Sequence, residues 1–120
     1  MRGLRTVLYP SPDLARGKAF YAAVLGTPPY FDEPFYVGFS ASGFELGLLP
    51  DATPGADGAL AYWGVDDIAA EHARILALGA RPLEPVHDVG GGILVATVLD
   101  PMGNALGLIY NPHFQLDQVR

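Results

Sequence analysis

Hydrophobic residues follow the same pattern twice along the chain. In each copy a short segment of strand character precedes a stretch with helical spacing that ends in Leu-Gly. Asp13 and Asp67, which open the two helical stretches, are 54 positions apart. Gly26 and Gly79, which end them, are 53 positions apart. A nearly constant offset indicates a repeated unit, and since only two copies fit, the pattern predicts a duplicated module.

The first helical stretch has start and stop signals of its own. Ser11 is expected to cap the helix, with Pro12 in the opening position and Asp13 in the first turn, where an acidic side chain suits the helix dipole. Gly26 supplies a left-handed stop. The apolar stripe between these signals, at helical spacing, consists of Leu14, Phe20, Tyr21, Val24 and Leu25.

The second helical stretch repeats this arrangement. Asp66 or Asp67 is expected to cap it, and Gly79 to end it. Its buried face is expected to consist of Ile68, His72, Ile75 and Leu76. The two helices therefore occupy equivalent places in the two copies.

Extended segments broken by turn residues follow each helix. In the first copy they lie around Tyr30 and Phe31 and at residues 36–39 and 44–49; in the second they lie at 83–89, 93–99 and 105–110. The glycines at 90–92 precede a strand and not a helix, so they predict a hairpin turn and not a phosphate-binding loop. Each copy therefore has the order β-α-β-β-β. The predicted fold is one α+β domain over residues 1–120, with a first module at about 4–50, a linker at 51–58, a second module at about 59–110 and a tail at 111–120.

Composition narrows the class of protein. There is no cysteine, which excludes disulfides and thiolate ligands. The formal charge is −6 and the seven basic residues are scattered, so nucleic acid is not an expected partner. No apolar run is long enough for a membrane span, and the first residues lack the apolar core of a signal peptide. A cytoplasmic location is expected.

Several motifs, in this order and spacing, resemble the vicinal oxygen chelate superfamily, which includes glyoxalases, bleomycin resistance proteins and extradiol dioxygenases. They are Pro-Asp-Leu at 12–14, Phe-Tyr at 20–21, Leu-Gly at 25–26, Val-Asp-Asp at 65–67 and Asp-Pro-Met-Gly-Asn at 100–104. The resemblance implies two half-open curled sheets with helices outside and a pocket within. It also implies a homodimer in which modules pair.

In the metal-using members of that superfamily, four side chains converge on one divalent ion. Carried over by the motifs, the four positions are Thr6, Glu45, Leu60 and Gly107. Only Glu45 is a good ligand, and tight binding of a transition metal needs about three protein ligands. The sequence therefore predicts no metal and no other cofactor.

Glu45 is the candidate functional residue, because it is the one of the four positions that keeps a side chain able to bind a ligand. One hypothesis is an acid in an apolar pocket, with its pKa raised by burial, that pairs with a cationic ligand group or acts as a base. The alternative is a strand residue that faces solvent or bonds within the chain. The further candidate ligand-binding residues are Phe31, Phe35, Tyr36, Tyr62, Trp63, His87 and Tyr110.

Three functions are compatible with these residues. The first is a metal-independent protein that binds an aromatic or cationic small organic molecule in an aromatic pocket with one acidic residue. The second is an enzyme of the same superfamily, either a metal-free lyase or isomerase in which Glu45 is the candidate catalytic residue, or a divergent, dioxygenase-like metal enzyme with its ligands at other positions. The third is an accessory protein that has kept the shell and lost the site.

Overall fold

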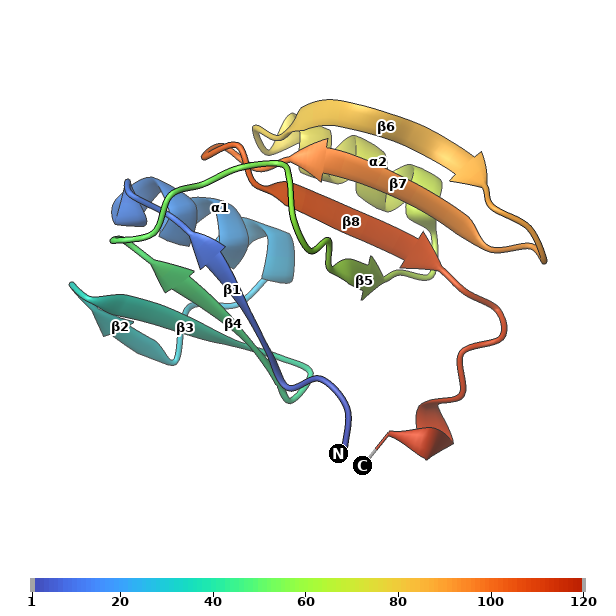
Figure 1. Ribbon diagram of the computed structural model, residues 1–120, viewed down its shortest axis with the longest axis horizontal. Coiled ribbons are helices and arrows are strands. Elements are labelled where there is room, and N and C mark those ends of the chain that lie inside the picture. Colours follow the sequence, from blue (N-terminus) through green and yellow to red (C-terminus); the bar gives the residue numbers. More distant parts are fainter. Residues whose placement is uncertain (1, 120) are drawn as a thin grey trace.

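The computed structural model describes residues 2–119 and contains two modules with the same order of elements (Figure 1). The first consists of β1 (Thr6–Pro10), α1 (Leu14–Leu25), β2 (Phe31–Glu33), β3 (Tyr36–Ala41) and β4 (Phe44–Leu49). The second consists of β5 (Tyr62–Gly64), α2 (Ile68–Ala77), β6 (Arg81–Asp88), β7 (Leu94–Leu99) and β8 (Ala105–Tyr110), followed by a 3₁₀ turn, η1 (Leu116–Gln118). The predicted α+β fold of two βαβββ modules is confirmed. Neither α-helix in residues 2–119 has the length and apolar character needed to cross a membrane.

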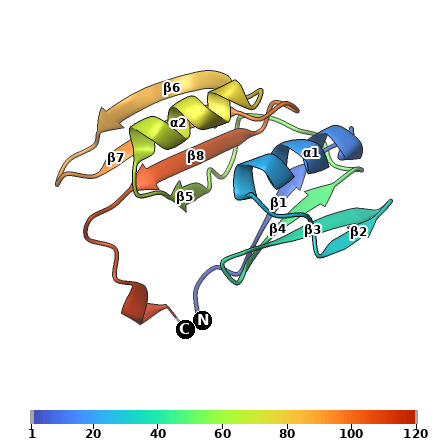
Figure 2. The same cartoon turned by 180° about the vertical axis from the view of Figure 1, so that it is seen from behind.

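The two modules have identical topology. Sheet A has the strand order β1-β4-β3-β2 and sheet B the order β5-β8-β7-β6. In each sheet the first and last strands of the module pair in parallel, and the other neighbours are antiparallel. Both helices cover one side of the sheets, so each sheet keeps a face without a helix (Figures 1 and 2). The sheets are open and do not close into a barrel.

The capping residue predicted from the sequence is confirmed for α2 and is wrong for α1. Asp13, not Ser11, caps α1, because its carboxylate accepts a hydrogen bond from the amide of Arg16 at 3.1 Å. Pro12 consequently precedes the cap. In α2, Asp67 makes the equivalent bond to the amide of Ala70 at 3.1 Å. In both cases an oxygen reaches the amide three residues on, the geometry that satisfies a free N–H at a helix start.

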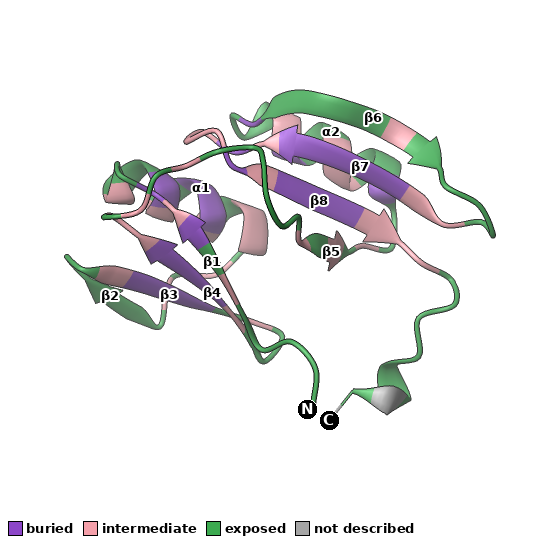
Figure 3. Cartoon of the chain, viewed as in Figure 1, coloured by how far each residue is buried: buried purple, intermediate pink, exposed green. Residues whose placement is uncertain are grey.

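One hydrophobic core lies between the helices and both sheets (Figure 3). Alternate residues of the central strands point into it, as the period of two in a strand requires. In sheet A the fully buried residues are Val37, Phe39, Leu46 and Leu48; in sheet B the matching ones are Ala96, Val98, Leu106 and Leu108. Because these side chains form one continuous cluster, the two modules share a core.

A buried carboxylate joins the two modules. Asp100, at the turn between β7 and β8, is 1% exposed and accepts a 2.7 Å hydrogen bond from the hydroxyl of Tyr21 in α1. The same carboxylate accepts bonds from the backbone amides of Met102 and Asn104, which close the turn. The Asn104 side chain also donates to Asp100 and to the backbone carbonyl of Pro10 in β1. Four donors thus satisfy a group that would be costly to bury alone.

Two further contacts tie the modules together. The indole N–H of Trp63 donates to the hydroxyl of Tyr9 at 3.0 Å. This side-chain hydrogen bond links β5 of one sheet to β1 of the other. The Arg74 guanidinium of α2 donates to the backbone carbonyls of Ala23 and Val24 at the C-terminal end of α1. A cation there satisfies free carbonyls and suits the negative end of the helix dipole. The modules are therefore held by hydrogen bonds as well as by the shared core.

Removing the donor at this joint should destabilise the fold. We expect Tyr21→Phe to lower the free energy of unfolding by about 1–3 kcal/mol, because the buried carboxylate loses a charge-assisted hydrogen bond. Urea denaturation followed by circular dichroism measures the change. Tyr110→Phe is the matched control, since Tyr110 is also packed against the core but has no hydrogen bond through its hydroxyl within residues 2–119. Equal stability of the two variants would contradict the assigned role of Asp100.

Candidate functional site

The helix-free face of sheet A carries the candidate site. Because the buried residues of β3 and β4 point to the core, the residues that alternate with them point the opposite way. Glu45 is the register partner of Thr6 on β1 and of Ser40 on β3. The next row on this face has Gly47 opposite Gly38. Polar side chains thus lie beside a stretch of sheet that has no side chains.

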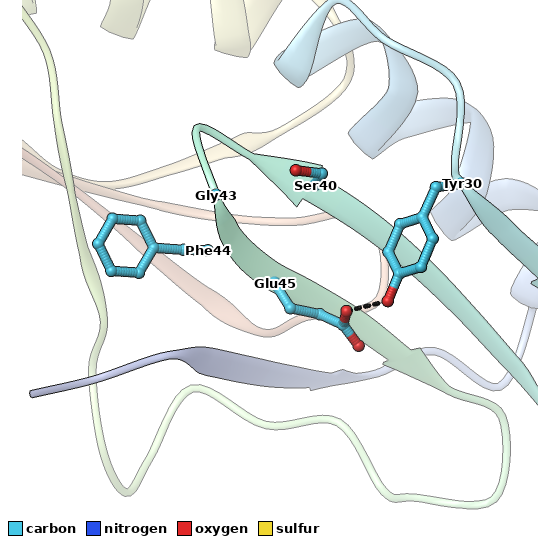
Figure 4. A pocket seen from close by; sticks show the side chains of 5 residues that line it. All are labelled: Tyr30, Ser40, Gly43, Phe44 and Glu45. Carbon is cyan, nitrogen blue, oxygen red and sulfur yellow. Dashed lines mark hydrogen bonds between the residues drawn. The ribbon is translucent and has the colours of Figure 1, made fainter. Parts of the chain in front are cut away.

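Two tyrosines fill that bare stretch and meet at Glu45. The hydroxyl of Tyr30 donates to one carboxylate oxygen of Glu45, and the hydroxyl of Tyr36 donates to the other. Figure 4 shows the Tyr30 ring with its hydroxyl directed at the Glu45 carboxylate. We refer to Tyr30, Tyr36 and Glu45 as the tyrosine–glutamate cluster. Both oxygens of the acid are held, so its orientation is fixed.

The in-strand glycines make room for these rings. A Cβ atom at Gly47 would lie 2.1 Å from the hydroxyl oxygen of Tyr36, closer than atoms can approach. At Gly38 a Cβ would lie 3.1 Å from the Tyr36 ring and 3.3 Å from the Tyr30 ring. Glycine in a strand interior commonly marks such a close approach. The two glycines are therefore part of the site.

An open hollow of about 330 Å³ lies beside the cluster. Its lining consists of Tyr30, Ser40, Gly43, Phe44 and Glu45 (Figure 4). Its volume is at the lower end of the range for sites that hold small organic ligands, roughly 300–1,000 Å³. The hollow brings the Tyr30 ring, a serine hydroxyl and the Glu45 carboxylate together, whereas the Phe44 ring points away from Glu45 (Figure 4). This set can bind an apolar group and a hydrogen-bond donor together.

The ionisation of Glu45 differs from the expectation from sequence. Hydrogen bonds from Tyr30 and then Tyr36 lower the pKa of Glu45, outweighing the opposing effect of burial. The expected rise in its pKa is therefore wrong, because the expectation assumed an acid without donors. Burial, and then the hydrogen bond to Glu45, raise the pKa of Tyr36 to about 12. The pKa of Tyr30 is raised mainly by its hydrogen bond to Glu45.

Three of the predicted aromatic residues lie near the cluster or within it. Phe31 is the register partner of Gly38, and its ring centroid is 6.0 Å from that of Tyr36 and 5.9 Å from that of Phe35. Phe35 is 66% exposed. These rings therefore lie beside Tyr36 of the cluster.

Two other predicted residues lie on the opposite side of their sheet. Trp63 and Tyr110 pack against the hydrophobic core, and the Trp63 indole is bonded to Tyr9 across the joint between modules. The structure therefore does not bring these two side chains to Glu45. The physical reason is strand parity: Tyr110 is three residues from Gly107, so the two point to opposite faces of β8.

Tyr62 and His87 lie in sheet B, away from the cluster in sheet A. Tyr62 is 46% exposed and its ring lies over Gly107. His87 is on β6, the outer strand, where its ring bonds the backbone carbonyl of Pro85 at 2.7 Å and lies 3.8 Å from a carboxylate oxygen of Glu84. Within one chain, these residues and Glu45 do not form a single site.

The four family metal positions do not fit a metal. Thr6 and Glu45 are neighbours across β1 and β4, so two of the positions do lie side by side. In sheet B, however, a Cβ at Gly107 would be 2.7 Å from the Tyr62 ring, so the ring fills the space of the lost ligand. Leu60 precedes β5 and offers no donor atom. No group of three or more His, Asp or Glu within residues 2–119 is arranged to hold an ion.

The site also contains two residues that the sequence did not predict to be part of it. Tyr30 lies in the loop before β2 and Ser40 on β3, and both line the hollow. Two signals were present in the sequence: Gly38 and Gly47 interrupt strand patterns, which indicates that something approaches the backbone closely. The sequence did not indicate that the approaching groups are tyrosines.

The coupling between the tyrosines and Glu45 has a measurable pH signature. In the wild type, Tyr36 should ionise at about pH 12. In Glu45→Gln it should ionise at lower pH, because a neutral amide no longer disfavours the phenolate. Ring-¹³C tyrosine NMR across an alkaline titration measures this, and Tyr36→Phe identifies the signal. Ionisation of wild-type Tyr36 near pH 10 would show that the cluster does not form.

The same cluster should affect stability at two ends of the pH scale. A lowered Glu45 pKa stabilises the folded state above the unfolded value of about 4.5, and this contribution is lost as the pH falls through the lowered value. A raised Tyr36 pKa stabilises the folded state below about 10, and this is lost as the pH rises through about 12. Near neutral pH both contributions are present.

Known structures with the same fold extend over nearly the whole chain. A glyoxalase-related enzyme from Fulvimarina pelagi matches with a TM-score of 0.79 and 20% identity, covering 93% of this chain and 90% of that one. A lactoylglutathione lyase from Agrobacterium tumefaciens matches with a TM-score of 0.77 and 22% identity, covering 96% and 99%. A glyoxalase/bleomycin resistance protein from Albidiferax ferrireducens matches with a TM-score of 0.76 and 20% identity, covering 91% of this chain and 98% of that one.

At these identities the structural matches establish the fold and not the activity. No curated protein matches the chain. A family model described as a glyoxalase-like domain matches residues 6–109, a span that includes both modules. The chain therefore belongs to the glyoxalase-like domain family.

Proposed function

We propose that this protein binds a small organic molecule on the helix-free face of sheet A without a metal ion. The observation that carries the proposal is the tyrosine–glutamate cluster, in which two phenols orient an acid at the edge of a hollow of about 330 Å³. The hollow supplies aromatic surface for an apolar body, and Glu45 supplies an acceptor for a polar group.

The charge of the cluster favours a cationic group on the ligand. Glu45, whose pKa is lowered, is ionised at neutral pH. Each of its oxygens accepts one phenol, and a carboxylate oxygen has a second lone pair for a further donor. A protonated amine can therefore bond the carboxylate while its organic body contacts the rings. The net charge of −6 also attracts cations at long range.

The same ionisation weighs against Glu45 as a general base. An effective base has a pKa near the operating pH, and hydrogen bonds that lower the pKa of a carboxylate make it a weaker base. The four metal positions likewise offer too few ligands for Lewis-acid chemistry. Binding is thus the function that these residues support better than a lyase, isomerase or dioxygenase reaction.

A pair of probes tests the proposed site. Benzylammonium and neutral benzyl alcohol share a ring and differ in charge. We expect the wild type to prefer benzylammonium, and Glu45→Gln to weaken its binding by roughly 10- to 150-fold, the loss of a charged hydrogen bond. Binding of benzyl alcohol should change little. Chemical-shift titration of backbone amides measures both affinities and locates the probe.

Glu33→Gln is the matched control for this experiment. Glu33 is on β2 of the same sheet, is exposed, and is the register partner of Tyr36. Glu33→Gln is the same chemical change as Glu45→Gln. It removes one negative charge from the same face and leaves the tyrosine–glutamate cluster in place. If Glu33→Gln and Glu45→Gln weaken benzylammonium equally, the attraction is a general charge effect and the site assignment fails.

We also propose that the protein forms a homodimer that covers the helix-free faces. Large hydrophobic side chains are exposed on this side of both sheets: Leu8 is 49% exposed, Phe31 38% and Tyr62 46%. Apolar area of this kind, gathered on one side of a small protein, marks an interaction surface. Two-fold pairing buries the same patch on both copies.

Pairing through this surface should be visible in solution. We expect sedimentation velocity at micromolar concentration to give a dimer, and Leu8→Glu to shift it to a monomer, because a charge would be buried at the interface. Leu4→Glu is the control, because Leu4 is 87% exposed and precedes β1. A monomeric wild type at micromolar concentration would refute the proposed pairing.

A further inference from the structure

The chain continues beyond β8 as an arm that projects from sheet B. We call residues 111–119, which include η1, the C-terminal arm (Figure 1). The ring of His113 bonds the backbone carbonyl of Gly91 at 2.7 Å, and the amide of His113 donates to the side chain of Asn111 at 2.9 Å. These bonds tie the base of the arm to the turn between β6 and β7, so the arm leaves the sheet in a fixed direction. It begins after residue 109, where the family match ends.

The outer part of the arm is apolar and uncovered. Phe114 is 64% exposed, Leu116 74% and Val119 41%. The hydrogen bonds given for these residues stay within the arm: the amide of Phe114 donates to the carbonyl of Asn111, and the amide of Val119 to the carbonyl of Leu116. Exposed apolar side chains gathered in one place mark an interaction surface. Since the chain itself leaves them uncovered, the surface that covers them belongs to another molecule.

The helix-free face of sheet A has uncovered apolar surface of the same kind. Leu8 is 49% exposed and Phe44 38%. Leu8 is the register partner of Gly47, and Phe44 lines the open hollow beside Glu45. Binding sites for small organic molecules usually enclose most of the surface of the ligand. A hollow on a single sheet does not do so, and a wall is therefore missing.

The charges of the arm and of this face are complementary. Asp117 is an exposed acid on the arm. Arg2 and Arg5 precede β1 at the edge of sheet A, and the carbonyl of Arg5 accepts the amide of Glu45 at 2.8 Å. Complementary charges orient two surfaces as they meet. An acid attracted to this edge brings the apolar residues of the arm to the hollow.

We propose that the C-terminal arm packs against the helix-free face of sheet A in a second copy of this chain, where Phe114 forms the missing wall of the hollow. The inference rests on the proposed homodimer, and it adds a residue that one copy contributes to the site of the other. Two-fold symmetry makes the exchange reciprocal, so each copy gives one arm and receives one. Aromatic side chains such as Phe114 are enriched at the centre of interfaces.

Phe114→Ser and Leu116→Ser test the arm by sedimentation velocity of the full-length protein over a range of concentrations. We expect each variant to raise the dissociation constant of the dimer by at least roughly tenfold, because a large apolar side chain no longer leaves water on pairing. Leu78→Ser is the matched control. Leu78 is 38% exposed at the C-terminal end of α2, so the same change on the helix side should leave the constant unaltered. An unaltered constant in both arm variants would overturn the proposal.

Dimers mixed from ¹³C-labelled and unlabelled chains show which copy receives the arm. We expect isotope-filtered NOEs between the Phe114 ring of one copy and the Phe44 and Leu8 side chains of the other. NOEs to these residues within the same copy would show that the arm folds onto its own chain, and would overturn the proposal. A complete lack of NOEs from Phe114 to sheet A would overturn it as well.

Benzylammonium reports what the arm adds to the hollow. At a concentration where both variants are dimers, it should bind Phe114→Ser roughly 2- to 10-fold more weakly than Leu78→Ser, because the wall is lost. Equal affinities would contradict the assigned place of Phe114.

Failure of this inference is distinguishable from failure of the proposals beneath it. A dimer that Leu8→Glu dissociates and the arm variants do not would leave the homodimer in place and remove the arm from it. If benzylammonium does not bind the wild type, the ligand site in sheet A fails, and the NOEs still decide whether the arm is exchanged.

Discussion

The arrangement of the molecule depends on one buried carboxylate. Asp100 closes the turn between β7 and β8 through backbone amides, and it also accepts the Tyr21 hydroxyl from the helix of the other module. A group that needs four donors in a buried place can be satisfied in few arrangements, so it fixes how the two modules meet. Both helices lie on one side of the sheets, and both helix-free faces open to the other (Figures 1 and 2). The tyrosine–glutamate cluster is on that open side.

Residues without side chains decide what the open faces can hold. In sheet A, Gly38 and Gly47 leave room for two tyrosine rings, whose hydroxyls then reach Glu45. In sheet B, Gly107 leaves room for the ring of Tyr62. A strand glycine weakens a sheet by entropy and by lost packing. Here the tyrosine rings pack over the glycines and replace the contacts that glycine side chains cannot make. Each glycine and the ring that covers it therefore depend on each other.

The sequence predicted the fold better than the site, because the fold follows from local signals that agree with one another. The repeat offset and the strand boundaries of β4 and β8 needed no tertiary information. The α1 cap was misassigned because Ser11 and Asp13 are both good capping residues, and only the position of the helix amides selects Asp13. The ionisation of Glu45 depends instead on a distant contact. The pKa of Glu45 is lowered mainly by a hydrogen bond from Tyr30, a loop residue 15 positions away in the sequence. The Tyr30 hydroxyl reaches the carboxylate only once the strands have paired.

The groups that surround Glu45 differ from those that a metal site would provide. A metal ion would neutralise the acid and use up its lone pairs, and it would need further ligands that Leu60 and Gly107 cannot provide. Two phenols also hold the acid in place, but as neutral donors they leave its negative charge uncompensated and leave lone pairs available. The tyrosines thus supply the orientation that a metal would give without its Lewis acidity. An acid held in this way is suited to recognising a donor on a ligand and poorly suited to activating one.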